Sequence, residues 1–263
     1  MTLYRYCPVL LIFLSLAAGC RGRSDQDTGN ASHPTVAQTL NLPVTSITGT
    51  WCGLFKPAHD EVQIDTITGE NKAERPHTIT LFIDRMENGE ISGRSVCAGL
   101  DRPFSGVFTE DDSRIKAKLS EAGGNKYDGT FDLEIDKKQF QLEGTWTPFD
   151  HNRDSRTYTL TRKNFSYDPS AGIHPEASLR LLKSDDVNNL LKDELREMRN
   201  EIYARHGYAF KVKDVQAFFD GQPWYMPISL DVRKSLTSIE LKNEKLIKQF
   251  EKYADESYDD YGR

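Results

Sequence analysis

Apolar and polar residues alternate in short runs between residues 47 and 165. In the clearest run, 127–136, Phe131, Leu133 and Ile135 alternate with polar residues, which is the pattern of a strand with one buried and one solvated face. No helical periodicity interrupts these runs. About eight strands are predicted, each bounded by turn-forming residues. They cover residues 49–55, 78–83, 91–97, 103–109, 115–119, 127–136, 140–146 and 157–161.

The strand pattern favours an antiparallel meander that closes into a small β-barrel, because closure removes the exposed edges of a sheet. The segment Glu87-Asn88-Gly89-Glu90 has the composition of a tight hairpin turn, in which two successive residues need a positive φ. A sandwich of two sheets remains as an alternative architecture.

The Gly-Thr-Trp segment at residues 49–51 resembles the first-strand signature of lipocalin-like barrels. A barrel of this size has little room inside, so we expect Trp51, Phe131, Trp146 and Tyr158 to fill it. An open interior that holds a small apolar ligand is the alternative.

The period of the apolar residues becomes helical between residues 175 and 254. From Ser184 onward, apolar residues recur at steps of three and four up to Ile202, and Gly207 fits the left-handed position that ends a helix. A short second helix is expected over residues 214–219.

A third helix is expected to begin near Thr237 and Glu240, which have the spacing of a capping box. Residues 166–174 contain proline and glycine and are predicted to be a linker. The chain is therefore predicted to be an α+β multi-domain protein, with an all-β domain (47–165) followed by a small all-α domain (175–254).

Residues 1–19 have the layout of an export signal. Arg5 supplies positive charge, and the apolar run Val9–Ala18 is too short to cross a membrane core as a helix but has the length found in signal peptides. Small residues then precede Cys20. This arrangement resembles the lipobox of bacterial lipoproteins.

The lipobox resemblance implies that the chain is cut before Cys20 and that lipid on this cysteine, palmitate included, anchors the protein in a membrane. The residue that follows is Arg21 and not aspartate, which implies the outer membrane if the host is Gram-negative. Residues 20–46 are polar and small and are predicted to be a disordered tether, whereas 255–263 are predicted to be an acidic, solvated tail.

Two of the four cysteines, Cys7 and Cys20, belong to the predicted export and lipidation signal. The other two, Cys52 and Cys97, would lie in an oxidising compartment, where we expect a disulfide between them. Two free buried thiols are the alternative. The six histidines have no metal-ligand spacing to one another or to a cysteine, so neither a metal nor another cofactor is predicted.

Residues 199–210 read RNEIYARHGYAF, followed by two phenylalanines at 218–219, Trp-Tyr at 224–225 and the stretch 243–247. This pattern resembles the YARHG domain, a family of small modules in secreted and surface-attached bacterial proteins. The resemblance implies a compact helical fold and a location outside the cytoplasm, and it implies no assigned activity.

Eight residues in this region are candidates for a binding surface: Arg199, Tyr203, Arg205, His206, Gly207, Tyr208, Trp224 and Tyr225. One interpretation is structural, with the arginine and histidine bonded to backbone carbonyls and the aromatic residues closing a small core. The other is a groove with an aromatic floor and a cationic edge, which suits a glycan or a carboxylate-bearing peptide. This groove would be formed by Arg205, His206, Trp224 and Tyr225.

The formal net charge of -6 argues against a nucleic-acid partner, which needs a basic surface. No triad, carboxylate pair or metal set stands out, so the protein is not expected to be an enzyme. The sequence favours a membrane-anchored binding or structural module of the cell envelope that contacts peptidoglycan or an envelope protein. The alternatives are a lipocalin-like carrier of a small apolar ligand and an inhibitor that inserts Ser92-Gly93-Arg94 into the cleft of an envelope hydrolase.

Overall fold

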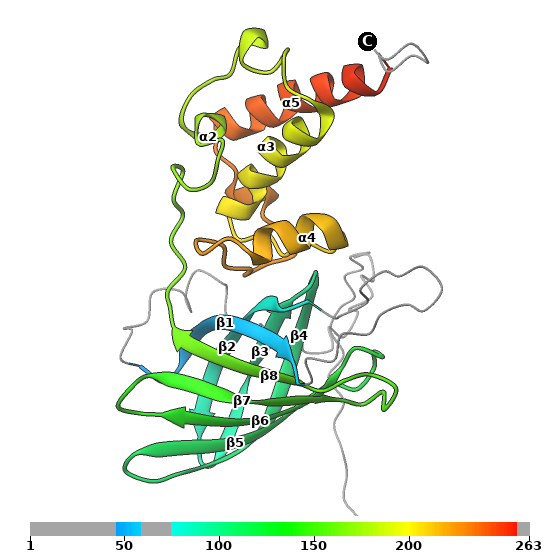
Figure 1. Cartoon of the computed structure of the whole chain (residues 1–263). Coiled ribbons are helices and arrows are strands. Elements are labelled where there is room, and N and C mark those ends of the chain that lie inside the picture. Colours follow the sequence, from blue (N-terminus) through cyan, green and yellow to red (C-terminus); the bar gives the residue numbers. More distant parts are fainter. Residues whose placement is uncertain (1–45, 59–74, 257–263) are drawn as a thin grey trace, which may run out of the picture. The chain divides into compact units, whose positions relative to one another are not determined.

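The computed structural model describes residues 46–58 and 75–256. The predicted export signal, the lipidation site Cys20, nearly all of the tether and nearly all of the acidic tail lie outside these residues. Within the described part, a β-barrel is followed by a helical region (Figure 1). None of the helices in this part of the chain has the length and apolar character needed to cross a membrane.

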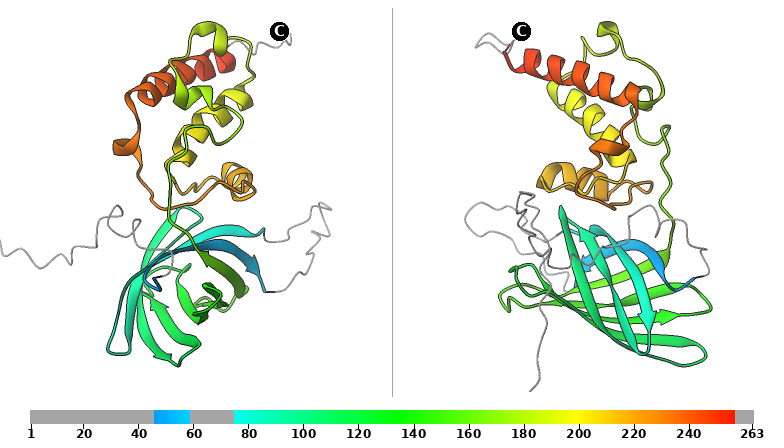
Figure 2. Two further views of the ribbon diagram at one scale, coloured as in Figure 1. Left: turned by 90° about the vertical axis from the view of Figure 1, so that its left-hand side faces the viewer. Right: turned by 180° about the vertical axis from the view of Figure 1, so that it is seen from behind.

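Eight antiparallel strands form a closed barrel, in which each strand pairs with the next and β8 returns to β1 (Figure 1, Figure 2). The strands are β1 (Gly49–Pro57), β2 (His77–Glu87), β3 (Glu90–Cys97), β4 (Leu100–Glu110), β5 (Arg114–Glu121), β6 (Gly129–Asp136), β7 (Gln141–Pro148) and β8 (Arg156–Arg162). The predicted closed meander is confirmed, and the β1–β8 ladder excludes the sandwich. Asn88 and Gly89 have φ angles of 54° and 79°, as the predicted hairpin turn requires.

Apolar side chains fill the interior of the barrel. Strands β5 and β6 alternate between buried and more exposed positions, which sends every second side chain inward. The four aromatic residues expected inside are at most 5% exposed: Trp51, Phe131, Trp146 and Tyr158. The rings of Phe131 and Tyr158 meet edge to face with centroids 5.7 Å apart. The interior is thus filled as expected.

Arg162, the last residue of β8, ties the start of the barrel together. Its guanidinium donates hydrogen bonds of 2.7 Å each to the carbonyls of Ser46, Thr48 and Thr50, and lies 5.9 Å from the centre of the Trp51 ring. Three backbone carbonyls at the entrance to β1 are therefore satisfied by one side chain.

Glu121, at the end of β5, is a buried carboxylate of the barrel and only 3% exposed. It accepts hydrogen bonds from Ser95 Oγ (2.8 Å), the Gly129 amide (2.8 Å) and Trp146 Nε1 (3.2 Å), and Arg102 Nη1 lies 3.6 Å away. Burial raises the pKa of Glu121 in spite of these partners. The carboxylate on β5 therefore contacts residues of four other strands: β3, β4, β6 and β7.

Helices and short 3-10 turns make up the rest of the described chain. They are α2 (Glu176–Leu179), η1 (Ser184–Asp186), α3 (Lys192–Arg205), α4 (Lys213–Asp220), η2 (Arg233–Ser235) and α5 (Ser238–Glu256). Apolar residues of α2, α3 and α5 share one core, which includes Ala177, Leu195, Met198, Ile202 and Ile247. The predicted small all-α region is confirmed.

The helix predicted to begin at Ser184 begins at Lys192 instead. Residues Ser184–Asp186 form a separate 3-10 turn, and α3 has its own start, where the side chain of Glu194 accepts a hydrogen bond of 2.7 Å from the amide of Leu191. Val187 nevertheless packs in the helical core. The helical spacing of apolar residues therefore continues across the break between η1 and α3, so the break could not be recognised from the sequence.

The other helix boundaries agree closely with the sequence pattern. Helix α4 spans 213–220, against an expected 214–219. At the start of α5, the Glu240 amide donates to Thr237 Oγ1 (3.2 Å) and the Thr237 amide donates to Glu240 Oε2 (2.8 Å). This is the predicted capping box.

The helical region packs on the outer face of strands β1 to β3. Met226 and Ile228 share an apolar cluster with Cys52, Phe82 and Val96. A polar contact accompanies this cluster. The Asp220 carboxylate at the end of α4 accepts a hydrogen bond of 2.9 Å from the amide of Thr78 in β2.

The predicted disulfide between Cys52 and Cys97 is wrong, because both thiols are free and buried. Cys52 pairs in register with Thr80, and Thr80 pairs with Val96, so Cys52 and Val96 face outward together. Cys97 follows Val96 and therefore points into the barrel. Strand β2 also separates the two cysteines by about 10 Å in strand spacing, beyond the Cα distance that a disulfide spans.

The segment Ser92-Gly93-Arg94 lies within β3 and not in a loop. The guanidinium of Arg94 covers the Phe82 ring at 3.7 Å and donates to the Asp101 carboxylate (2.7 Å) and the Ile228 carbonyl (3.3 Å). The segment is therefore built into the sheet and is not placed to enter another protein's cleft.

Candidate functional site

Helix α3 ends inside the motif that spans residues 199–210. Arg205 is its last residue, His206 caps it, and Gly207 follows with a φ of 75°. A Cβ atom at Gly207 would lie 2.4 Å from Ile228 Cγ1, so the position needs glycine for both conformation and space. The predicted left-handed glycine at the helix end is confirmed.

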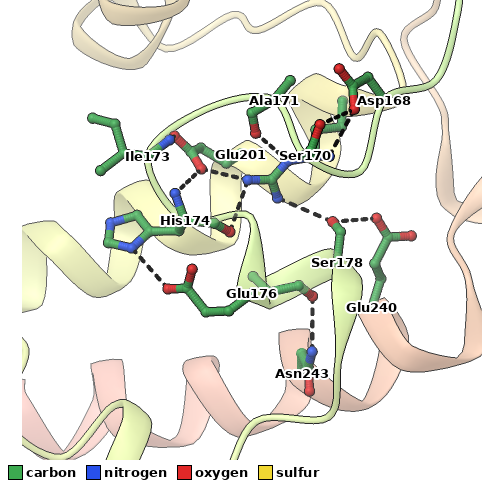
Figure 3. Close-up of polar contacts among 12 residues, drawn as sticks. Asp168, Ser170, Ala171, Ile173, His174, Glu176, Ser178, Glu201, Glu240 and Asn243 are labelled. Carbon is green, nitrogen blue, oxygen red and sulfur yellow. Dashed lines mark hydrogen bonds and ion pairs between the residues drawn. The ribbon is translucent and has the colours of Figure 1, made fainter.

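The guanidinium of Arg205 is completely buried. It donates to the carbonyls of Ala171 (2.7 Å) and His174 (2.8 Å), to Ser178 Oγ (3.1 Å) and to Glu201 Oε2 (2.6 Å). Figure 3 shows these partners converging from the segment before α2, from α2 itself and from α3. Arg205 therefore holds an irregular segment against the end of α3 by charge-assisted hydrogen bonds.

Glu201 holds the same segment from one turn earlier on α3 (Figure 3). Its carboxylate accepts hydrogen bonds from the amides of Ile173 (2.7 Å) and His174 (2.8 Å). Gly172 has a φ of 91°, and a Cβ there would lie 2.6 Å from the Glu201 carboxylate. The loop thus wraps a buried carboxylate closely enough to require glycine.

His206 is buried and bonded to Glu240, with Nε2 and Oε2 2.8 Å apart. The ring of Tyr167 stacks on the imidazole at a centroid distance of 4.4 Å. Glu240 also accepts from Ser178 Oγ (2.7 Å) and the Thr237 amide (2.8 Å). Burial by itself raises the pKa of Glu240, but the hydrogen bonds from His206, Ser178 and Thr237 outweigh it and lower the pKa to about 2.

Trp224 and Tyr225 belong to a small aromatic core. Tyr225 is 4% exposed, and its hydroxyl donates to the Tyr208 carbonyl at 2.8 Å. Burial raises the pKa of Tyr225. Trp224 is half-buried and meets the Phe219 ring edge to face, with centroids 6.0 Å apart. These rings close a core, as the structural interpretation of the motif expects.

The eight predicted site residues therefore do not share one surface. Arg205 and His206 point inward with their polar atoms bonded to the protein, so they do not line a groove with Trp224 and Tyr225. Arg205 does bond two carbonyls as the structural interpretation states, whereas His206 bonds a carboxylate. We refer to Arg205, His206 and their partners Glu201 and Glu240 as the internal clamp.

The other face of α3 borders a surface groove of about 410 Å³. Three predicted residues, Arg199, Tyr203 and Tyr208, line it. The remaining lining residues come from α3, α4, η2 and the two loops that flank α4. They are Arg196, Asn200, Phe210, Lys211, Val212, Val215, Leu230, Asp231, Val232 and Arg233. We call this the basic groove.

Cationic residues are concentrated at the basic groove although the chain as a whole is acidic. Four cationic residues line it against a single carboxylate, that of Asp231, while the formal net charge of the chain is -6. Arg199 forms a two-point ion pair with Glu251 of α5 (2.7 and 3.1 Å), and Arg196 pairs with Asp214 (2.7 Å). The pairs orient both guanidinium groups along the wall of the groove.

Tyr203 connects the basic groove to α5. Its hydroxyl donates to Glu244 Oε1 at 2.6 Å, and burial together with this carboxylate raises the pKa of Tyr203 to about 12. The tyrosine hydroxyl therefore stays protonated at neutral pH and keeps the ring in one orientation at the edge of the groove.

Several groove residues were not predicted from the sequence. Arg196, Arg199 and Tyr203 are spaced by three and four residues, so they lie on one helical face, and this spacing could have included Arg196. Lys211 comes from the loop before α4 and Arg233 from η2; the fold brings both to α3, and no local pattern marks them.

Comparison with protein families assigns the helical region. Residues 171–252 match the YARHG domain. This part of the chain is a YARHG domain. A search of curated proteins finds no match to the chain.

The five residues that name the YARHG domain have different positions in it. Tyr203 faces the basic groove, whereas Ala204 is 2% exposed and packs in the aromatic core. Arg205 and His206 form the internal clamp, and Gly207 provides the chain reversal. Four of the five residues therefore serve the fold, and the fifth, Tyr203, lines the groove.

Metal-ligating side chains do not gather in the described residues. Nowhere in 46–58 and 75–254 do three His, Cys, Asp or Glu side chains lie close enough together to hold a metal ion.

Proposed function

We propose that the mature protein is a lipid-anchored, non-enzymatic binding module of the bacterial cell envelope, and that its YARHG domain contacts cell-wall glycan or an envelope protein. The observation that carries this proposal is the basic groove, which presents cationic and aromatic side chains on an acidic protein. Such a lining suits a ligand that carries carboxylates.

The compartment follows from two lines of support. A YARHG domain indicates an extracellular or periplasmic module. The resemblance of the segment before Cys20 to a lipobox supports membrane anchoring through lipid on that cysteine, at the outer membrane if the host is Gram-negative.

The lipid anchor is tested by metabolic labelling with an alkyne-bearing palmitate analogue. The parent chain should incorporate the label and sediment with membranes, and a Cys20→Ser variant should do neither. Incorporation by the variant, or none by the parent, would remove the anchor from the proposal.

The barrel supports a structural role more than a carrier role. Its interior is occupied by large apolar side chains such as Trp51, Phe131 and Leu142, all at most 1% exposed. A carrier needs an interior of several hundred Å³ for its ligand. The outer face of the barrel instead supports the YARHG domain through the cluster around Met226.

The engagement of polar groups in the YARHG domain supports a non-enzymatic role. Ser178 and His206 both bond to Glu240 and not to each other, so they do not make a nucleophile–base pair. Their geometry is that of a carboxylate held by two donors.

A pull-down tests the binding function. Lipidated protein in detergent micelles is incubated with purified peptidoglycan and, separately, with solubilised envelope proteins at low and high salt. The groove variant Lys211→Gln/Arg233→Gln removes two exposed positive charges, and Lys242→Gln/Lys245→Gln removes two from the exposed surface of α5.

The parent and the α5 variant should be retained at low salt, and the groove variant should be lost. Equal retention of the groove variant would move recognition away from the groove. If the parent is retained on neither material, the proposed function is wrong.

A further inference from the structure

We infer that the ligand of the basic groove is an acidic peptide segment that carries an apolar side chain. This inference rests on the proposed binding function and narrows it to one class of ligand. The groove combines free positive charge, an amide donor and an aliphatic rim around one volume of about 410 Å³. A volume of this size accommodates a ligand of a few residues.

Two of the groove cations, Lys211 and Arg233, have no close ion pair among the described residues. Lys211 makes no ion pair or hydrogen bond with any described residue. The side chain of Arg233 is 70% exposed, with Nη2 3.9 Å from Glu244 Oε1, whereas Glu244 has closer partners in Tyr203 and Lys248. An incoming carboxylate would therefore meet the unpaired ammonium of Lys211 and would have to weaken only the long contact between Arg233 and Glu244.

Asn200 adds a donor suited to a peptide backbone. The residue is 7% exposed and lines the groove, and its Oδ1 accepts a hydrogen bond of 3.3 Å from Arg199 Nη1. That bond orients the amide, and over the described residues Nδ2 finds no acceptor. An amide nitrogen at the groove without an acceptor in the described part of the chain can donate to a carbonyl oxygen, which each residue of a peptide supplies.

The apolar part of the groove favours a peptide over a glycan. Val212 and Leu230 stand at its rim with 57% and 42% of their surfaces exposed. The rings of Tyr208 and Phe210 meet edge to face at 5.0 Å, and Tyr203 is tilted against Tyr208 at 6.0 Å. The rings thus pack on one another and form no row of open faces for sugars, while the aliphatic rim fits an aliphatic side chain.

Fluorescence anisotropy with synthetic probes tests the inference. The first probe is a short labelled peptide in which Glu and Leu alternate. The second replaces Glu by Gln and tests charge, and the third replaces Leu by Ser and tests the apolar contact. Soluble peptidoglycan fragments compete with the first probe in a separate titration, and the lipidated full chain in detergent micelles is the receptor throughout.

The Glu–Leu probe should bind about tenfold more tightly than either altered probe at low salt, and added salt should weaken it. The Lys211→Gln/Arg233→Gln variant should lose about tenfold in affinity for this probe, and the Lys242→Gln/Lys245→Gln variant should match the parent. Leu230→Ser should weaken the Glu–Leu probe severalfold and leave the Glu–Ser probe unchanged.

The outcomes separate the inference from the proposed function. Groove-dependent binding of the Glu–Leu probe supports both. Groove-dependent binding of peptidoglycan fragments without the probe keeps the function and overturns the inference in favour of a glycan. Equal affinity for the Glu–Leu and Gln–Leu probes also overturns it, and binding of neither probe nor fragments overturns both.

Discussion

The barrel and the YARHG domain are stabilised by different interactions. The barrel closes eight strands around apolar side chains, and its backbone groups are satisfied by neighbouring strands. The YARHG domain has shorter regular elements, and buried polar contacts such as Arg205–Glu201 and His206–Glu240 hold its irregular segments in place. A sheet that closes on itself needs few polar side chains inside, whereas loops that pass over a helix need side chains to satisfy their amides and carbonyls.

The pKa values of two buried glutamates, Glu121 and Glu240, illustrate this difference. Burial dominates at Glu121 in the barrel and raises its pKa, although four donors lie nearby. At Glu240 in the YARHG domain, the bonds from His206, Ser178 and Thr237 outweigh burial and lower the pKa to about 2. The same side chain is therefore a cost to the barrel when ionised and a source of stability to the helical domain.

Removal of the clamp arginine should have the largest effect. Arg205→Met leaves the buried carboxyl group of Glu201 without its partner, so the free energy of unfolding should fall by about 3–5 kcal/mol. Urea unfolding followed by far-UV circular dichroism measures the loss. Arg196→Met, at the more exposed pair with Asp214, is the matched control and should cost about 1 kcal/mol or less. Equal losses of unfolding free energy in the two variants would show that the internal clamp stabilises the fold no more than the control ion pair does.

A cavity in the barrel core should rank next. Leu142 is fully buried, and Leu142→Ala should lower the free energy of unfolding by about 2–4 kcal/mol through lost apolar contacts and the space left behind. Tryptophan fluorescence during urea unfolding reports on Trp51 and Trp146 inside the barrel. Val107→Ala, at a side chain that is 63% exposed, should change stability by less than about 0.5 kcal/mol. A loss at Val107 as large as at Leu142 would contradict the packing.

Acidification should change the contributions of Glu240 and Glu121 to the free energy of unfolding in opposite directions. Because the pKa of Glu240 is lowered from 4.5 to about 2 in the fold, its contribution is present above pH 4.5 and is lost as pH falls through that range. Because the pKa of Glu121 is raised, its contribution is greatest below pH 4.5 and decreases as pH rises through the raised pKa. Glu240→Gln should therefore reduce acid sensitivity.

Hydrogen exchange checks this pH response region by region. On acidification from pH 5 to pH 3, and after correction for intrinsic exchange, protection near Thr237 should fall while protection of the Gly129 amide should not. An equal loss of protection at both amides would contradict the opposite pH dependence expected for Glu240 and Glu121.

The smallest effect should come from reductant. Since Cys52 and Cys97 are free, dithiothreitol should leave the unfolding midpoint of the barrel unchanged. Alkylation in denaturant without reductant should modify both thiols, as measured by mass spectrometry. A reductant-sensitive midpoint together with protected thiols would restore the disulfide and would require a different register of β1 to β3.

Much of the barrel could be predicted from the sequence because strand periodicity is local. Alternation over each strand shows which side chains face inward, and the Asn88-Gly89 turn determines how β2 and β3 connect. The cysteines show the limit of this reasoning. Their pairing depends on the register of β1 and β3 across β2, and no local pattern contains that register.

The binding region was predicted less completely. The sequence motif located Arg199, Tyr203 and Tyr208, but it also included Arg205 and His206, which point inward. A charged residue at a helix end has the same sequence appearance whether it meets solvent or a buried carboxylate.

By itself, the sequence indicated the capping of α5 and the left-handed glycine after α3, because both follow from local backbone preference. It favoured a closed meander with a filled interior over a sandwich or an open barrel, because strand periodicity is local. Only the tertiary structure decided which polar residues become internal and which line a groove. Arg205 meets Glu201 and distant loop carbonyls, and Lys211 and Arg233 meet α3, through contacts between segments that are remote along the chain. Burial and charge pairing depend on those long-range contacts, so they cannot be assigned one residue at a time.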